Sequence, residues 1–158
     1  MQNVIEESKT EFTRAKERIA KCLDVTSEDK LNWSPSSTSR TPIKLVAHSA
    51  MAIQGIGGIL AGKPFPFTSM AEMDATFRAE EEIVTTKEQA LALLEETSAA
   101  YLKWLDTVTP EQLASTVQFP MGAMPMAVAI TFAADHMRSH AAQLDYLQTI
   151  IGDLDWHL

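Results

Sequence analysis

Apolar residues recur along most of the chain in the three- and four-residue steps of an α-helix, while few segments alternate as strands do. Residues 3–24 begin this pattern. Ile5, Phe12 and Ile19 fall at heptad spacing there, and charged side chains fill most of the positions between them. Such a stripe predicts an amphipathic helix whose apolar face packs against other helices.

The second helical segment has a well-marked start and stop. Thr41 suits the position before the first helical turn, Pro42 suits the first helical position, and Gly62 follows the last periodic residue. His48 lies on the inward stripe of this segment together with four residues at helical spacing: Leu45, Ala52, Gly55 and Ile59. We therefore expect a helix from Pro42 to about Ala61 with His48 facing the protein interior.

Three glycines, Gly55, Gly57 and Gly58, lie inside this second segment. Each costs a helix about 1 kcal/mol relative to alanine, so their presence calls for a reason. They indicate either the close approach of a neighbouring helix, a partner subunit or a ligand, or simple tight packing. The sequence leaves these alternatives open.

Two further segments complete the set of long helices. Thr86 and Gln89 have the spacing of a capping box, which predicts the start of a third long helix. The last long helix is expected over about residues 124–151, with Pro125 in its first turn and Gly152 ending it.

The segments between these helices are too long to be tight turns. In residues 24–40 we expect a single helical turn, followed by a loop in which Trp33 closes one end of the core. Residues 62–84 contain a short irregular helix at about 70–82, and residues 117–119 are predicted to be extended. The two long connectors allow a crossover topology, or they form the rim of a pocket.

Together these elements predict an all-α fold, a four-helix bundle with long connectors and short extra helices. The chain has 158 residues, which is the usual length of one domain with a core of its own. It contains no internal repeat and no evident domain boundary. We therefore expect residues 1–158 to form a single domain.

Composition and charge narrow the classes of partner. The net charge is -8 and no cluster of Lys and Arg stands out, which argues against nucleic acid as a partner. The longest apolar stretch, residues 44–60, is interrupted by polar residues and glycines, so no membrane span is expected. The single cysteine, Cys22, cannot form an internal disulfide, and the first residues do not resemble a signal peptide. These features favour a cytoplasmic protein.

Three histidines carry the candidate chemistry. His136 and His140 are four residues apart, so a helix places them on one buried face about 6 Å apart along its axis. Two imidazoles at this spacing can chelate one ion, with His48 as the candidate third ligand. A HxxxH pair alone is a weak signal, and a lone inward histidine is more often a hydrogen-bonded core residue. One shared divalent metal ion gives all three buried imidazoles a common role, which favours the metal site.

The residues around the three histidines limit the reactions that the site can catalyse. Met137 follows His136, so the glutamate of the zincin pattern HExxH is missing and metalloprotease activity is not expected. No acid shares the inward face with the histidine pair, so no general base is evident. Three nitrogens leave an open coordination position and suit Zn, Ni, Fe or Mn. Gln143 could hydrogen-bond a ligand imidazole or a substrate, or simply a neighbouring helix. His157 as a fourth ligand and Cys22 as a nucleophile are less favoured.

Three motifs, taken in order, resemble a known family: LNWSP at 31–35, TPIKLVAHSA at 41–50 and HMRSHAAQLDYLQTIIGD at 136–153. One histidine in the second helix followed by H-x3-H-x2-Q in the last is similar to the signature of the DinB/YfiT-like superfamily of metal-dependent enzymes. The resemblance spans about residues 3–153. It implies a four-helix bundle, often dimeric, in which His48, His136 and His140 bind one divalent ion. Some relatives are S-transferases or isomerases that use low-molecular-weight thiols such as bacillithiol or mycothiol.

The leading hypothesis is a metal-dependent enzyme of the thiol-dependent S-transferase or hydrolase type. It would act on a small-molecule substrate through the three-histidine site. An enzyme of the S-transferase type would also use a low-molecular-weight thiol as cosubstrate. The alternative is a non-catalytic helical bundle that binds a metal or another ligand. We also expect a homodimer, with the glycine-bearing second helix and the apolar loop Pro64–Phe67 as candidate contacts. The native metal, the substrate and the reaction stay open.

Overall fold

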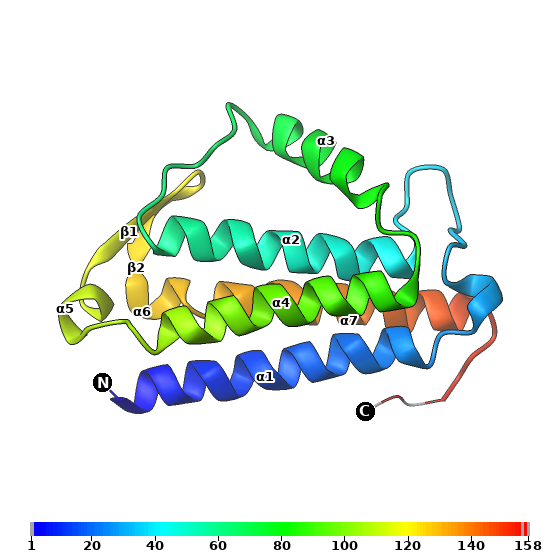
Figure 1. Ribbon diagram of the computed structural model, residues 1–158, viewed down its shortest axis with the longest axis horizontal. Coiled ribbons are helices and arrows are strands. Elements are labelled where there is room, and N and C mark those ends of the chain that lie inside the picture. The colour runs from blue at the N-terminus through cyan, green and yellow to red at the C-terminus, as the bar shows by residue number, and fades with distance from the viewer. Residues whose placement is uncertain (1, 156, 158) are drawn as a thin grey trace.

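The computed structural model describes residues 2–155 and 157, and four long helices dominate it (Figure 1). These are α1 (Gln2–Asp24), α2 (Pro42–Leu60), α4 (Lys87–Leu105) and α7 (Phe132–Ile150). The shorter elements are η1 (Glu28–Lys30), α3 (Met70–Glu81), α5 (Pro110–Leu113), β1 (Thr116–Phe119), β2 (Gly122–Pro125) and α6 (Met126–Ala129). The predicted all-α four-helix bundle is confirmed.

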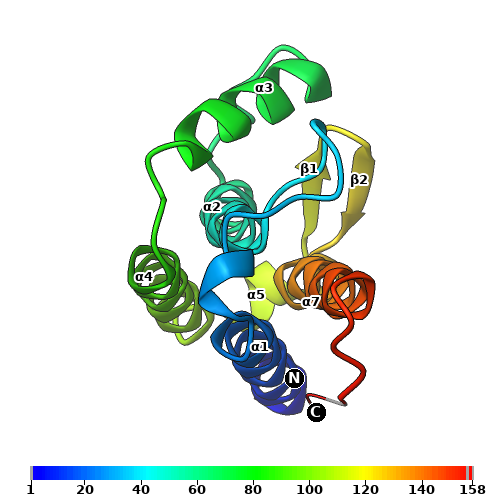
Figure 2. The same cartoon turned by 90° about the vertical axis from the view of Figure 1, so that its right-hand side faces the viewer.

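The bundle has a crossover topology. Seen from its end, the helices follow one another around the core in the order α1, α4, α2, α7 (Figure 2). In the side view, α1 and α7 run in one direction and α2 and α4 in the other (Figure 1). The parallel helices α2 and α4 are joined by residues 61–86, which carry α3 across the outer side of α2. This connector adds α3 to the bundle as an extra layer over α2.

The predicted helix starts are confirmed by their caps. The Thr41 hydroxyl accepts the backbone N–H of Lys44 at the start of α2, with Pro42 in the first turn. At α4 both halves of the capping box between Thr86 and Gln89 are present. These local hydrogen bonds satisfy backbone donors that a helix leaves free at its N-terminus, which is why short sequence signals located both starts.

The last helix differs from the prediction of one helix over residues 124–151. Residues 122–125 form β2, which pairs antiparallel with β1, and α6 and α7 are separate helices. The carbonyl of Ile130 accepts the hydroxyls of Ser8, at 3.2 Å, and Tyr101, at 2.7 Å. Because side chains of α1 and α4 hold this carbonyl, the helix breaks there and restarts at Phe132. The extended segment 117–119 was predicted, whereas its partner strand was not.

The core lies between the four long helices and matches the predicted stripe. Phe12 and Ile19 of α1 are fully buried, and Ile5 and Trp33 pack against the core from partly buried positions.

Among the described helices, α2 alone has the length and composition that could cross a membrane, and 56% of its apolar window is buried inside the protein. The central helix of a soluble bundle has the same properties, so α2 gives only weak evidence of a membrane span.

One of the glycines of α2 marks a close approach of α4. A Cβ atom added at Gly57 would lie 3.3 Å from Cδ2 of Tyr101. That ring packs against Phe12 and Trp104, with centroid distances of 4.8 and 5.7 Å, and its hydroxyl is bonded to Ile130. Tyr101 therefore has little room to move. Gly57 thus marks the close approach of a neighbouring helix, which was one of the alternatives left open by the sequence.

Alanine substitutions at Gly57 and Gly58 should have opposite effects on stability. At Gly58 the nearest atom to a new Cβ is Cδ of the flexible Lys63, at 3.6 Å. We expect G58A to raise the free energy of unfolding by about 0.5–1 kcal/mol, because alanine favours the helix. We expect G57A to lower it by about 1 kcal/mol through overpacking against Tyr101. Urea unfolding measures both changes, and equal gains for the two variants would contradict the close approach.

Candidate metal centre

The structure brings the three predicted histidines together. His48 lies in the second turn of α2, and His136 and His140 lie one turn apart on the facing side of α7. One ring nitrogen from each can be chosen so that all three lie within 4.8 Å of one another. The ring centroids are 5.2 Å apart for His48 and His136, 4.9 Å for His48 and His140, and 4.4 Å for His136 and His140. Three ring nitrogens are thus gathered in one place between α2 and α7.

The spacing of the facing nitrogens fits a common ion. The Nε2 atoms of His136 and His140 are 3.1 Å apart. Two nitrogens that each lie about 2.0–2.1 Å from a tetrahedral ion are separated by about 3.3 Å. The observed separation is close to this value, so the pair needs only a small adjustment to become two ligands.

Hydrogen bonds from other residues orient two of the rings. Nδ1 of His48 lies 2.9 Å from Oε1 of Glu81, and Nδ1 of His140 lies 2.7 Å from Oε1 of Gln143. An ionised carboxylate and an amide oxygen can only accept, so in each neutral ring the proton resides on Nδ1. The Nε2 atom is then left with its lone pair, which is the state that a metal ligand requires. Of the alternatives for Gln143, the contact with an imidazole of the histidine group, that of His140, is the one observed.

A buried acid, Glu81, belongs to this site although sequence reasoning missed it. Its side chain is 1% exposed, and Nε of Arg40 donates to both carboxylate oxygens, at 3.0 and 2.8 Å. Nη2 of Arg40 also donates to Oδ1 of Asp74, at 2.9 Å. The expectation that no acid shares the inward face with the histidine pair did not cover this contact, because Glu81 meets His48. The acid comes from α3, outside the bundle, and not from the helices that carry the histidines.

The surroundings keep the two histidines of α7 neutral and Glu81 ionised. Burial, reinforced by the neighbouring His140 and His48, lowers the pKa of His136 to about 3. Burial also lowers the pKa of His140, although its hydrogen bond with Gln143 opposes this. For Glu81, burial alone would raise the pKa, but the hydrogen bonds from His48 and Arg40 outweigh it and hold the pKa below its ordinary value. The site thus presents lone pairs at neutral pH, backed by a negative charge.

The two less favoured candidates lie elsewhere. His157 sits beside Asp153, with Nε2 and Oδ2 2.9 Å apart, and is not part of the three-histidine group. Cys22 is a fully buried residue of the α1 core, and burial raises the pKa of its thiol to about 12. A thiol in this state is a poor nucleophile, so Cys22 is a core residue.

A groove of about 580 Å³ runs beside His140. His140 and Gln143 line it from α7, and residues of the connector before α2 line it from the other side, among them Arg40. The long connector at residues 24–40 thus forms part of a pocket rim. The groove gives a small molecule a place to lie next to the ring of His140.

A family model, the DinB superfamily, matches residues 11–144 of the sequence. The chain belongs to the DinB superfamily. No curated protein matches the sequence at a significant level. The family assignment confirms the resemblance carried by the histidine motifs, and His48, His136 and His140 all lie within the matched range.

Solved structures show that members of this fold differ in function. DfsB, described as a sibling lethal factor precursor, has a TM-score of 0.75 at 18% identity, over 94% of this chain and 96% of its own. YfiT from Bacillus subtilis, described as a probable metal-dependent hydrolase with an unusual four-helix bundle topology, has a TM-score of 0.74 at 16% identity, over 94% of this chain and 87% of its own. The mycothiol-dependent maleylpyruvate isomerase has a TM-score of 0.70 at 15% identity, over 89% of this chain, which spans only 60% of the isomerase. At these identities the likeness shows a shared fold.

Replacing Glu81 by glutamine should weaken metal binding by this DinB-superfamily chain. The amide keeps the shape, but its NH₂ group must face a donor, either His48 or Arg40. We expect metal affinity to fall about 10- to 100-fold, as is usual when the partner of a ligand histidine is lost. Competition with a chromophoric chelator measures the change.

Glu82→Gln is the matched control for this variant. Glu82 is the next residue, its side chain is 67% exposed, and it pairs with Lys44. We expect unchanged metal affinity for E82Q. Equal affinities of E81Q and the wild type would show that Glu81 does not orient His48.

Proposed function

We propose that this protein is a metal-dependent enzyme that acts on a small molecule through His48, His136 and His140. The proposed cofactor is one divalent ion, with Zn, Ni, Fe and Mn all suited to imidazole ligands. The convergence of three ring nitrogens from two helices, two of them oriented by Glu81 and Gln143, carries the proposal. The family, and the description of YfiT as a probable metal-dependent hydrolase, support a metal-dependent reaction.

The donor set favours a reactive site over a purely structural one. Within the described residues, the group that could hold a metal consists of these three histidines and no fourth ligand. The Glu81 carboxylate is already bonded to Arg40 and His48. A coordination position is therefore left for a substrate, a water molecule or a thiol. When bound, such an ion lowers the pKa of a coordinated water or thiol and polarises a carbonyl group.

The protein's own residues have three tasks in this proposal. Arg40 and Glu81 fix the ring of His48, and Gln143 fixes the ring of His140. Phe77 of α3 packs edge-on against His48, with centroids 5.5 Å apart, and shields that side of the site from water. The groove beside His140 admits the substrate. In this proposal the substrate approaches His140 from the groove, while Glu81 and Phe77 cover the side of His48.

Two reaction types remain within this proposal, thiol-dependent S-transfer and hydrolysis. The mycothiol-dependent isomerase among the structural neighbours supports a low-molecular-weight thiol as cosubstrate, and YfiT supports hydrolysis. The second candidate function is a non-catalytic bundle that binds a metal or another ligand. It is favoured by the ion pair between Glu81 and Arg40, because a carboxylate held ionised in this way is a weak general base.

Metal content is the first test. Protein purified without a histidine tag and loaded with Zn, Ni or Mn should retain about one equivalent of metal, and H136A should lose it. Inductively coupled plasma mass spectrometry measures both. A wild-type content below about a tenth of an equivalent after loading, or full occupancy in H136A, would contradict the site.

An open coordination position separates the enzyme from the structural alternative. In protein loaded with Co²⁺, a low-molecular-weight thiol should produce a thiolate-to-cobalt charge-transfer band in the near ultraviolet. Absorption spectroscopy detects the band, and H136A serves as the control. A spectrum that no added thiol or small anion alters would indicate a closed site and favour the non-catalytic bundle.

We also propose that the protein is a homodimer and that it lies in the cytoplasm. The loop Pro64–Phe67 keeps two prolines exposed, and the neighbouring Met70 is 51% exposed, so apolar surface is available for a second copy. Gly57 of α2 is instead used within the chain, against Tyr101. Light scattering should give the mass of a dimer at micromolar concentration. A monomer throughout the micromolar range would contradict this part of the proposal.

A further inference from the structure

The groove beside His140 has a charge that contrasts with the rest of the chain. The chain has 21 acidic residues and 13 Lys and Arg residues, yet the groove is lined by two arginines, Arg40 and Arg78, and by no acid among the described residues. The acidic composition of the chain does not explain why positively charged side chains line this groove.

Both arginines keep donors available after their internal bonds are made. Nε of Arg78 donates to Oδ2 of Asp74, at 2.8 Å, and its Nη1 donates to the carbonyl of Thr38, at 3.2 Å. Arg40 uses Nε for Glu81 and Nη2 for Asp74. In the described part of the chain, Nη2 of Arg78 and Nη1 of Arg40 have no hydrogen-bond partner. The acids therefore fix the guanidinium groups without lining the groove themselves.

The opposite wall of the groove is apolar. It is formed by Tyr146, Leu147 and Ile150 of α7, and Leu45 of α2 also lines the groove. Tyr146 is 67% exposed and Ile150 is 45% exposed, so large side chains face solvent there without covering. A ligand complementary to both walls carries a negative charge at one edge and an apolar body beside it.

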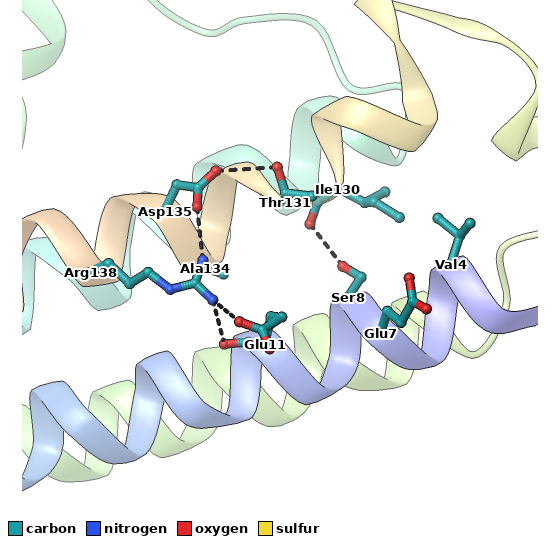
Figure 3. A pocket seen from close by; sticks show the side chains of 9 residues that line it. All are labelled: Val4, Glu7, Ser8, Glu11, Ile130, Thr131, Ala134, Asp135 and Arg138. Carbon is teal, nitrogen blue, oxygen red and sulfur yellow. Dashed lines mark hydrogen bonds and ion pairs between the residues drawn. The ribbon is translucent and has the colours of Figure 1, made fainter. Parts of the chain in front are cut away.

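A second cavity of the same bundle shows that this charge pattern is particular to the groove. The cavity between α1 and the break before α7 has a volume of about 350 Å³. Its one arginine, Arg138, is paired with Glu11 and Asp135, and Glu7 adds a third acid (Figure 3). Three acids and one arginine line that cavity, so an anion is expected to bind there less favourably than in the groove beside His140.

We propose that the groove binds a small organic anion with an apolar body, which Arg78 and Arg40 hold by its charged group. The opposite wall packs against the apolar part, and the ligand lies next to His140. The substrate class of the proposed enzyme would then be an amphiphilic carboxylate or a comparable anion. This assignment rests on the proposed function, whereas the anion preference of the groove can be tested without metal.

A pair of fluorescent probes tests the proposal. 8-Anilinonaphthalene-1-sulfonate is anionic, and N-phenyl-1-naphthylamine has the same aromatic body without the charge. We expect the full-length wild type, metal-free or zinc-loaded, to bind the sulfonate more tightly than the neutral probe. Arg78→Gln should weaken sulfonate binding about tenfold, as expected for the loss of a hydrogen bond to a charged group, and leave the neutral probe unaffected.

Arg138→Gln is the matched control. Arg138 is 40% exposed and paired with an aspartate of its own helix, just as Arg78 is 44% exposed and paired with Asp74. We expect wild-type binding of both probes by R138Q. Three results would overturn the proposal. R78Q could bind the sulfonate as tightly as the wild type, R138Q could lose as much sulfonate binding as R78Q, or the wild type could show no preference for the sulfonate.

A competition experiment on the wild type covers the case in which R78Q does not fold. Octanoate should displace the sulfonate, whereas octan-1-ol at the same concentration should displace much less. Equal displacement by the two would overturn the proposal. Because the metal-free protein is used in parallel, failure of the groove assignment is distinguishable from failure of the metal site, which metal content alone decides.

Discussion

The candidate site depends on three imidazole nitrogens being held within 4.8 Å of one another, where a lone pair from each can reach one ion. His48 and His140 are each about nine-tenths buried, so their polar nitrogens need partners within the protein. The second ring nitrogen of each is tied to an acceptor, Glu81 or Gln143, which fixes the tautomer and the ring orientation. The arrangement is stable only with such partners, and it is complementary to a divalent ion.

The crossover connector supplies part of what orients the histidine rings. The connector between α2 and α4 carries α3 across α2 (Figures 1 and 2). Glu81 and the ring of Phe77, both on α3, contact His48. Arg40 comes from the other long connector and compensates the buried Glu81 charge. The bundle therefore provides the ligands, while the two connectors provide what orients them and what lines the groove.

The parts of the structure that the sequence predicts are those set by local signals. Caps at Thr41 and Thr86 located two helices, and periodicity placed His48, His136 and His140 on inward faces. The break at Ile130 was missed because its cause is a carbonyl held by side chains distant in sequence. Glu81 was missed because it lies in a run of three glutamates that reads as surface. Phe77, four residues earlier on the same helix face, is the signal that could have identified it as inward.

The central claim is that three Nε2 atoms bind a single ion. A crystal structure of the metal-loaded protein, with anomalous diffraction recorded at the absorption edge of the metal, tests this most directly. One anomalous peak is expected about 2 Å from Nε2 of His48, His136 and His140, with Nδ1 of His48 still bonded to Glu81. A peak elsewhere, coordination through Nδ1, or rings too far apart to share an ion would contradict it.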